Sequence, residues 1–460
     1  MLNRSGADAT MGDDHTICVV GLGYVGLPTA ALFARSGLQV EGVDIDPEIV
    51  SRLSRGESSI QEPGVEEIVV ASLASGRLHA RMTPPDGADV FVICVPTPVD
   101  ASHRADMAFV LSATHSIVPR LRPGNLIILQ STSPIGSTRM IADLMRTAGF
   151  DPYEDLDICY CPERVFPGHT LDEMINNSRV IGGCTERAGQ RALELYKRFS
   201  LGALVVTSSE AAEFAKLMEN TYRDVNIALA NVFARIAEED GIDGMEAIRV
   251  ANMHPRVNIH APGAGVGGHC IPVDPWFLIE KYRELTPLLL AARTVNDTQP
   301  VRLLDRAERA GLRPENGRVA ILGVAYRGDI DDAREAPSEQ LAKELSLRGY
   351  HWEAHDPHVG IWKTHEGNHR VNPDLGEVLL GAGSIFLMTD HTAYRSLTTD
   401  ALDGFRGRLI VDGRNMLDPR PFEAQGFVVI QVGRPTPQPA IGDPAAVEPS
   451  AEFLADGAPT

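Results

Sequence analysis

The chain has 460 residues, a length that predicts roughly two to four domains. Hydrophobic residues make up 43% and charged residues 23%, which is typical of a globular protein with a core of normal size. The formal net charge of −20 argues against nonspecific binding to nucleic acids or to membrane surfaces. A substrate that is itself anionic would need local Lys and Arg side chains in its binding site.

The N-terminus and the cysteines favour a reducing, cytoplasmic compartment. Residues 1–15 are polar and acidic, so we expect a disordered segment and no signal peptide. No run of about 18 apolar residues could span a membrane. The six cysteines match no zinc-ribbon or zinc-finger spacing, and most lie in apolar runs typical of small buried side chains. We therefore expect no bound metal and no membrane or nucleic-acid partner.

Residues 16–207 alternate short apolar runs with helical patterns. The apolar runs predict strands at residues 17–20, 39–43, 90–95, 126–129, 157–160 and 204–206. Strands that alternate with helices indicate a parallel, doubly wound α/β sheet.

A glycine-rich loop between the first predicted strand and a helical pattern reads Gly21-Leu22-Gly23-Tyr24-Val25-Gly26. In such a loop the first glycine allows the tight turn, the second lets a pyrophosphate approach the backbone, and the third lets the helix pack on the strand. The amide groups at the start of the helix then face the phosphates. Asp44 ends the next strand, where its carboxylate would bind ribose hydroxyls and repel a 2′-phosphate. The pattern predicts NAD as the cofactor rather than NADP.

Polar residues follow three later strands, at the edge of the sheet where such folds bind ligands. Pro96 and Thr97 come directly after the run at 90–95, and Thr132 and Glu163 follow the next two strands. Each has an ordinary explanation when taken singly, as a rigid proline turn, a helix cap or a surface carboxylate.

Residues 208–300 are predicted to form a central helical domain with one long helix of roughly 30 residues. Ser208 or Ser209 can cap its start. Apolar positions recur every three or four residues along it, at Phe214, Leu217, Thr221, Val225, Leu229, Val232 and Ile236. Such a stripe is typical of the spine of a chain and of a dimer interface. Lys216 and Asn220 share a face of this helix, which by itself is typical of a solvated surface.

A glycine-rich loop with a cysteine, residues 262–273, is the sharpest local feature of this domain. Glycines such as Gly267 and Gly268 let a backbone pass close to a substrate. Cys270 lies among them, and Asp274 follows directly after the loop. Taken alone, a buried structural cysteine remains the better interpretation, by about two to one.

Residues 317–432 return to the alternation of strands and helices. Apolar runs at 319–322, 385–388, 409–411 and 428–432 predict a second, smaller nucleotide-binding-type sheet. The tail, residues 433–460, is rich in Pro, Ala, Gly and acidic residues and is expected to be disordered. The predicted fold class is α/β, with two Rossmann-like doubly wound sheet domains joined by a central helical domain with one long helix.

Taken together, these motifs closely resemble those of the UDP-glucose/GDP-mannose dehydrogenase family. The resemblance runs from about residue 16 to residue 432, with motifs in the family's order at residues 21–26, 95–98, 131–134, 162–164, 216–220, 267–274 and 332–337. It implies an NAD-binding domain at 16–207, a central dimerisation domain at 208–300 and a UDP-sugar-binding domain at 317–432. It also implies a homodimer or a dimer of dimers.

The resemblance further implies a four-electron oxidation of a sugar alcohol to a carboxylate with two NAD per sugar, in surface-polysaccharide synthesis. Cys270 would attack the intermediate aldehyde, and the thiohemiacetal would be oxidised to a thioester that water hydrolyses. Lys216 and Asn220 would stabilise the developing oxyanion. Glu163 and Asp274 would handle protons or orient water.

Other contacts carry over from the family by position. The implied cofactor contacts are Gly21, Gly23, Tyr24, Val25, Gly26, Asp44, Pro96, Thr97, Thr132 and Arg334, and Thr132 would also position the water. The implied substrate contacts are Arg164, Val165, Lys216, Asn220, Arg223, His254, Arg256, Gly267, Tyr326, Arg327 and Arg414. Arg256 is expected to reach a neighbouring subunit. The arginines would supply the positive charge that an anionic UDP-sugar requires.

This sequence departs from the glucose-type pattern at Pro167, where many such members carry a second carboxylate. Arg327 and Arg414 stand where lysine is common, which keeps the charge but changes the geometry. Three segments, at residues 161–168, 219–226 and 254–258, look most like the branch that oxidises UDP-N-acetyl-D-mannosamine. The alternatives are the same chemistry on UDP-N-acetylglucosamine, a nonenzymatic NAD-binding sensor, and a two-electron hydroxyacid-type dehydrogenase. No physical argument from the sequence separates the C2 epimers.

Overall fold

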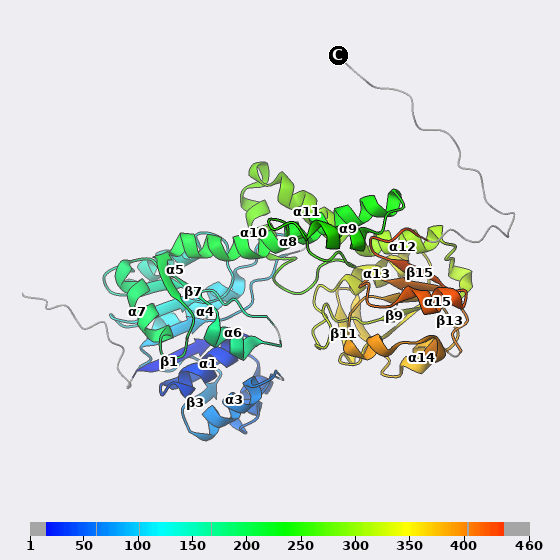
Figure 1. The fold of residues 1–460 in the computed structure, drawn as a ribbon. Coiled ribbons are helices and arrows are strands. Elements are labelled where there is room, and N and C mark those ends of the chain that lie inside the picture. Colours follow the sequence, from blue (N-terminus) through cyan, green and yellow to red (C-terminus); the bar gives the residue numbers. More distant parts are fainter. Residues whose placement is uncertain (1–14, 61, 101, 167, 403, 437–460) are drawn as a thin grey trace, which may run out of the picture.

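The computed structural model describes residues 15–60, 62–100, 102–166, 168–402 and 404–436 (Figure 1). The disorder expected for residues 1–15 and 433–460 falls almost wholly outside these ranges, and so does Pro167. Residues 433–436 are described, and they bond to the central helices. The Gly433 amide donates to Glu238 Oε1 at 2.8 Å, and the Arg434 carbonyl accepts from Arg306 Nη2 at 2.6 Å.

An eight-stranded sheet forms the N-terminal domain, in the order β3-β2-β1-β4-β5-β6-β7-β8. Its strands are β1 (Thr16–Val20), β2 (Gln39–Val43), β3 (Leu78–Arg81), β4 (Val90–Ile93), β5 (Leu126–Leu129), β6 (Asp157–Tyr160), β7 (Arg179–Gly183) and β8 (Leu204–Ser208). Its helices are α1 (Gly26–Arg35), α2 (Pro47–Ser54), α3 (Val65–Ala74), α4 (Ala108–Ile117), η1 (Val118–Arg120), α5 (Ser137–Thr147), α6 (Thr170–Asn176) and α7 (Glu186–Tyr196).

Both faces of this sheet are buried. Ile17 and Val19 of β1 pack in a cluster with Leu32 of α1, whereas Cys18 of the same strand packs in a second cluster with Ile141 of α5. Burial on both faces explains the nearly continuous apolar runs from which the strands were predicted. The doubly wound arrangement is therefore confirmed.

One pair of strands in the N-terminal sheet departs from the predicted parallel pairing. β6 and β7 pair antiparallel, while the other neighbouring strands pair in parallel. The segment between β6 and β7 contains only the seven-residue helix α6, which does not carry the chain back to the opposite edge of the sheet. β4 also ends earlier than expected, at Ile93, and the edge strand β3 alternates polar and apolar residues too briefly to have been predicted.

The central helices are α8 (Ser209–Glu239), α9 (Gly244–Ala251), α10 (Asp274–Lys281), η2 (Arg283–Leu285), α11 (Pro287–Asp297) and α12 (Gln299–Arg309). The predicted cap of the long helix is confirmed, because the Ser208 side chain accepts from the Ala211 amide. α8 runs from the N-terminal sheet toward the C-terminal one (Figure 1). A buried ion pair between Arg293 and Asp224, at 2.6 Å, fastens α11 to it.

A five-stranded parallel sheet forms the C-terminal domain, in the order β10-β9-β13-β14-β15. Its strands, with the separate hairpin β11–β12, are β9 (Arg318–Leu322), β10 (Trp352–His355), β11 (Ile361–Thr364), β12 (Gly367–Arg370), β13 (Ala382–Leu387), β14 (Leu409–Asp412) and β15 (Val428–Gln431). Its helices are η3 (Pro314–Asn316), α13 (Pro337–Leu347), α14 (Leu375–Leu379), η4 (Thr392–Ser396), η5 (Thr399–Leu402) and α15 (Pro419–Ala424). The predicted fold class, two doubly wound sheets joined by helices, is confirmed.

Within the described ranges, no helix combines the length and the hydropathy that crossing a lipid bilayer requires.

Candidate active site

The glycine-rich loop after β1 has the geometry that a dinucleotide needs. Gly21 has a φ of +94°, and a Cβ there would lie 2.5 Å from the Cys94 carbonyl oxygen. A Cβ on Gly26 would lie 1.8 Å from the Gly21 oxygen, so α1 approaches the loop as closely as only glycine allows. A Cβ on Gly23 would meet no atom within 4 Å, which leaves open space above the loop. The loop therefore fits a pyrophosphate at the start of α1.

Asp44 is fixed beside this loop by two backbone amides. Its Oδ2 accepts from Leu22 N at 2.7 Å, and its Oδ1 accepts from Asp46 N at 2.9 Å. Each carboxylate oxygen can accept a further hydrogen bond, which fits the two ribose hydroxyls of an adenosine.

Two further pairs of predicted cofactor contacts lie together. The Thr97 hydroxyl donates to the Thr132 carbonyl at 2.5 Å, which joins the loops after β4 and β5. The guanidinium of Arg334 lies 5.9 Å from the ring centre of Tyr24. Because Tyr24 belongs to the glycine-rich loop and Arg334 to the C-terminal domain, both domains border the cofactor site.

Cys270, Lys216, Asn220 and Asp274 form one cluster. Lys216 and Asn220 are one helical turn apart on α8 and are buried, and so is Asp274 at the start of α10. Asn220 Nδ2 donates to Asp274 Oδ2 at 2.5 Å, and the Asp274 amide donates to the Cys270 carbonyl at 2.8 Å. The sequence alone allowed this face of α8 to be a solvated surface. In the structure the cysteine loop and α10 cover it.

An apolar contact sets the alignment of α10 on α8. Leu217, next to Lys216, is fully buried in a cluster with Val273, Phe277 and Leu278. Further along α8, Asn231 Oδ1 accepts from the Gly263 amide at 2.9 Å and holds the entry of the loop of residues 262–273. The loop is therefore anchored on α8 at both of its ends.

Burial and charge set the protonation of this cluster. Burial raises the pKa of Asp274 to about 6, although the Lys216 ammonium and the Asn220 amide act to lower it. Burial also raises the pKa of the Cys270 thiol to about 11; the nearby Asp274 carboxylate raises it further, and Lys216 opposes both effects. The thiol therefore needs a proton acceptor in order to react near neutral pH.

The C-terminal domain covers the cysteine loop through Tyr326. A Cβ on Gly267 would lie 2.6 Å from Tyr326 Cβ, and a Cβ on Gly268 would lie 3.1 Å from its ring. The Gly268 amide donates to the Arg334 carbonyl at 3.0 Å. Arg414 Nη2 donates to Asp390 Oδ1 at 3.0 Å, and its Nη1 would lie 3.6 Å from a Cβ on Gly263. The glycines of the cysteine loop thus allow the substrate-contact candidates Gly267 and Tyr326 to meet.

Glu163 is not the surface carboxylate that its position in a loop allowed. It is buried, and its Oε2 accepts from Arg179 Nη1 at 3.0 Å and from Gln130 Nε2 at 3.2 Å. The Arg164 amide donates to its Oε1 at 2.9 Å. These three donors hold both carboxylate oxygens of Glu163 in place. Arg179, the partner of Glu163, was not predicted as a site residue. The feature of the sequence that could have identified it is a charged residue at the start of an apolar run.

Two of the arginines expected at the substrate, Arg223 and Arg327, lie around Phe166, which was not predicted. The guanidinium of Arg327 lies 3.9 Å from the centre of its ring, and that of Arg223 lies 5.6 Å from it. Arg164 instead forms an ion pair with Glu219 of α8. Val165 packs against the core of the N-terminal domain.

His254 and Arg256 lie in the exposed turn after α9, where the Arg256 amide donates to His254 Nδ1 at 3.3 Å. This exposure leaves both side chains accessible to a neighbouring subunit.

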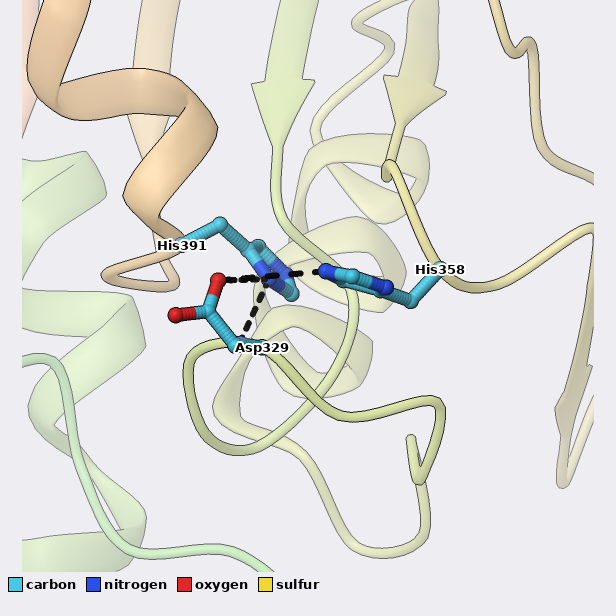
Figure 2. A group of neighbouring side chains, drawn as sticks. All are labelled: Asp329, His358 and His391. Carbon is cyan, nitrogen blue, oxygen red and sulfur yellow. Dashed lines mark hydrogen bonds and ion pairs between the residues drawn. The ribbon is translucent and has the colours of Figure 1, made fainter. Parts of the chain in front are cut away.

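A group of metal-binding residue types, Asp329, His358 and His391, lies at the C-terminal sheet, with one ligand atom of each within 4.8 Å of the others (Figure 2). His391 Nδ1, however, accepts from the Asp329 amide at 2.9 Å. Its proton is then on Nε2, which lies 3.0 Å from Asp356 Oδ2. Both ring nitrogens are thus used, and His391 has no lone pair for a metal ion.

Comparisons with known proteins cover all three domains. In the UDP-glucose/GDP-mannose dehydrogenase family, the NAD binding domain matches residues 15–200, the central domain residues 210–298 and the UDP binding domain residues 320–419. The UDP-N-acetyl-D-mannosamine dehydrogenase of Methanococcus maripaludis is 39% identical, over 92% of this chain and 97% of its own. The enzyme of that name from Yersinia pestis is 42% identical, over 83% and 95%. The solved structure of the UDP-D-ManNAc dehydrogenase from Pyrococcus horikoshii has a TM-score of 0.85 at 36% identity, over 91% and 99%.

Proposed function

Because the chain belongs to the UDP-glucose/GDP-mannose dehydrogenase family, and is thus an NAD-dependent nucleotide-sugar dehydrogenase, we propose that its substrate is UDP-N-acetyl-D-mannosamine (UDP-ManNAc). The observation that carries this choice is that relatives named for this sugar match most of the chain at 36–42% identity. Family membership argues against the nonenzymatic sensor. Cytoplasmic location and a role in surface-polysaccharide synthesis stay predictions.

The proposed reaction oxidises the C6 alcohol to a carboxylate in two steps, with one water consumed and two NAD reduced. NAD, when bound, accepts one hydride in each step. Between the two oxidation steps, the Cys270 sulfur adds to the C6 aldehyde to give a thiohemiacetal. The second step oxidises this thiohemiacetal to a thioester. Water then attacks the thioester carbon, and the carboxylate leaves as the thiol is restored.

The cluster on α8 and α10 supplies the groups that this sequence needs. The Lys216 ammonium and the Asn220 amide are donors for the oxyanion that forms at C6 when sulfur or water adds. Asp274, with a pKa of about 6, is ionised at neutral pH and can accept the proton that the Cys270 thiol loses. Arg223, Arg327 and Arg414 would carry the charge of the diphosphate.

The proposal is tested by counting NADH per sugar across UDP-ManNAc, UDP-N-acetylglucosamine, UDP-N-acetylgalactosamine and UDP-glucose as limiting substrates. We expect UDP-ManNAc to have the highest kcat/KM and to yield two NADH per sugar consumed, because Cys270 can hold the acyl group for the second oxidation. One NADH with release of free aldehyde would exclude the covalent mechanism. A higher kcat/KM for another UDP-sugar would show that this sugar is the substrate, and the proposed chemistry would stand.

Cofactor choice gives a second prediction. The Asp44 carboxylate, held by Leu22 and Asp46, would lie against the 2′-phosphate of NADP, so kcat/KM with NADP should be at least about 100-fold below that with NAD. Steady-state rates with both cofactors measure the ratio. Asp44→Ser, which removes the negative charge, should reduce the ratio of kcat/KM with NAD to kcat/KM with NADP. Equal efficiency with NAD and NADP in the wild-type protein would show that Asp44 does not contact the ribose.

Assembly gives a third prediction. Large apolar side chains on α8 are exposed in the single chain, namely Phe214, Met218, Tyr222, Leu229, Phe233 and Ile236. They recur every three to seven residues and so share one face of the helix. We propose that a second copy covers this face, so light scattering should give a homodimer or a multiple of it. Phe233→Glu should weaken the assembly, and a fully active monomer of the wild-type protein would exclude this role for α8.

A further inference from the structure

Three neighbouring strands of the C-terminal sheet end at the same edge, and polar residues follow each of them. β10, β9 and β13 are adjacent and parallel, so the segments after them lie side by side. Asp356 follows β10, Asp329 lies in the segment after β9, and His391 follows β13. Ligands of open α/β sheets bind beyond the carboxyl ends of the strands, next to such segments.

Asp356 acts as the acceptor that joins these segments. It is almost fully buried, and its Oδ2 accepts from the Val324 amide at 2.8 Å and from the Ala325 amide at 3.1 Å. The imidazole of His391 approaches the same oxygen, with Nε2 at 3.0 Å. Its Oδ1 accepts from the amides of His358, at 2.8 Å, and Val359, at 3.1 Å. One carboxylate thus binds backbone from two segments and a side chain from the third.

His391 holds the far end of the segment after β9. It is fully buried, and its Nδ1 accepts from the Asp329 amide at 2.9 Å. Asp329 has a φ of +60°, a backbone conformation that a residue other than glycine adopts only where its surroundings hold it. The Thr392 hydroxyl and amide donate to the Asp329 carboxylate at 2.6 and 2.8 Å. Residues 324–329 are therefore bonded at both ends to Asp356 and His391.

Between these two ends lie Tyr326, Arg327 and Gly328. The Tyr326 ring lies against Gly268 of the cysteine loop, and the Arg327 guanidinium lies over Phe166. A buried carboxylate and a buried imidazole are costly to desolvate, and their hydrogen bonds to the backbone amides of residues 324, 325, 329, 358 and 359 offset that cost. The polar network fixes the position of a segment whose side chains face the other two domains.

We propose that His391 and Asp356 are positioning residues for nucleotide binding: they hold residues 324–329 in the conformation in which Tyr326 and Arg327 meet the uridine diphosphate. This rests on the proposed function, which assigns those two side chains to the substrate. Neither His391 nor Asp356 needs to touch the ligand. Their effect falls on the affinity for the nucleotide, and not on the chemistry at Cys270 or on the affinity for NAD.

Two substitutions of His391 separate its two hydrogen bonds. His391→Asn places an amide oxygen where Nδ1 lies, and so keeps an acceptor for the Asp329 amide. His391→Gln places an amide nitrogen where Nε2 lies, and so keeps the donor to Asp356 but loses the acceptor for Asp329. We expect His391→Gln to raise the Kd of UDP, measured by calorimetry, by about 3- to 10-fold, the size of one hydrogen bond. His391→Asn should change the Kd less.

The kinetic readout separates positioning from general damage. In His391→Gln the KM for the UDP-sugar should rise in step with the Kd of UDP, while kcat and the Kd of NAD stay within about twofold of the wild-type values. If this variant does not fold, Thr392→Val serves instead, because it removes an exposed hydroxyl that bonds to Asp329. It should also weaken UDP binding.

His358→Asn is the matched control. The exposed His358 imidazole belongs to the same group, but its contact with residues 324–329 is a 3.8 Å ion-pair contact to Asp329 Oδ1, which is longer than a hydrogen bond. Its backbone amide, which the substitution keeps, donates to Asp356. Its Kd for UDP should equal that of the wild-type protein, with or without EDTA. An equal loss in His358→Asn, or a loss caused by EDTA, would identify a metal site and overturn the positioning role. Unchanged UDP binding in both His391→Gln and Thr392→Val would also overturn it. Failure of the wild-type protein to bind UDP would instead contradict the proposed function.

Discussion

Replacing Cys270 by serine should lower steady-state NADH production by about 10³-fold or more, the scale seen when a catalytic nucleophile is removed. A serine hydroxyl has nearly the shape of the thiol but is a far weaker nucleophile at neutral pH. The first oxidation needs hydride transfer and a base but no thiol, so it should survive. We expect at most one NADH per active site in a single turnover, and unchanged affinity for NAD and for UDP.

The matched controls for this variant are Cys161→Ser and Cys94→Ser. The Cys161 thiol is buried near Arg179, and the Cys94 thiol lies 3.5 Å from Gln130 Oε1. Both substitutions should lower the free energy of unfolding by about 1 kcal/mol and leave kcat unchanged. Near-wild-type turnover by Cys270→Ser, or loss of turnover in a folded Cys161→Ser protein, would contradict the assignment of the nucleophile.

Mass spectrometry offers an independent observation of the covalent intermediate. Wild-type protein that is quenched during turnover should carry an acyl group on the peptide that contains Cys270. Because burial raises the pKa of this thiol, the unreacted Cys270 is mostly protonated and reacts slowly with alkylating reagents. An acyl adduct on any other cysteine would show that that cysteine, and not Cys270, is the nucleophile.

Local patterns in the sequence were enough for the cofactor loop and for the spacing of the cluster. The loop of residues 21–26 depends on one turn between β1 and α1, so its residues and their contacts are close in sequence. Lys216 and Asn220 share a face because a helix fixes that geometry within one turn. Their burial could not be predicted, since it depends on α10 and the cysteine loop, which pack on this face from more than 40 residues away.

The two site residues that were missed, Arg179 and Phe166, depend on partners from other parts of the chain. Arg179 is an ordinary charged residue at the start of β7 until Glu163, on the neighbouring strand's loop, forms an ion pair with it. Phe166 could not be recognised as a site residue for the same reason, since its contact with Arg327 comes from the C-terminal domain. The antiparallel pairing of β7 with β6 likewise follows from the path of a connection, about which periodicity carries no information.

Replacing Lys216 by methionine should lower kcat by about 10²- to 10³-fold, the effect of removing one donor to an oxyanion. Methionine keeps most of the length and the apolar stem of lysine, so the packing of α8 under α10 should persist. Lys197→Met is the control, because the Lys197 side chain is exposed and pairs with Glu194. Its kcat should not change.

The pH dependence of the Lys216 variant distinguishes charge from packing. Asp274 acts as a proton acceptor only when ionised, so kcat/KM of the wild-type protein should rise with pH through about 6 and then level off. Lys216 lowers the pKa of Asp274, and its removal leaves burial less opposed. In Lys216→Met the rise should therefore shift to higher pH, which rates measured from about pH 5 to pH 9 would detect. A drop in kcat with no shift of the rise would show that Lys216 stabilises the oxyanion without acting on Asp274. A wild-type kcat together with an unshifted rise would mean that the Lys216 ammonium acts on neither the oxyanion nor Asp274.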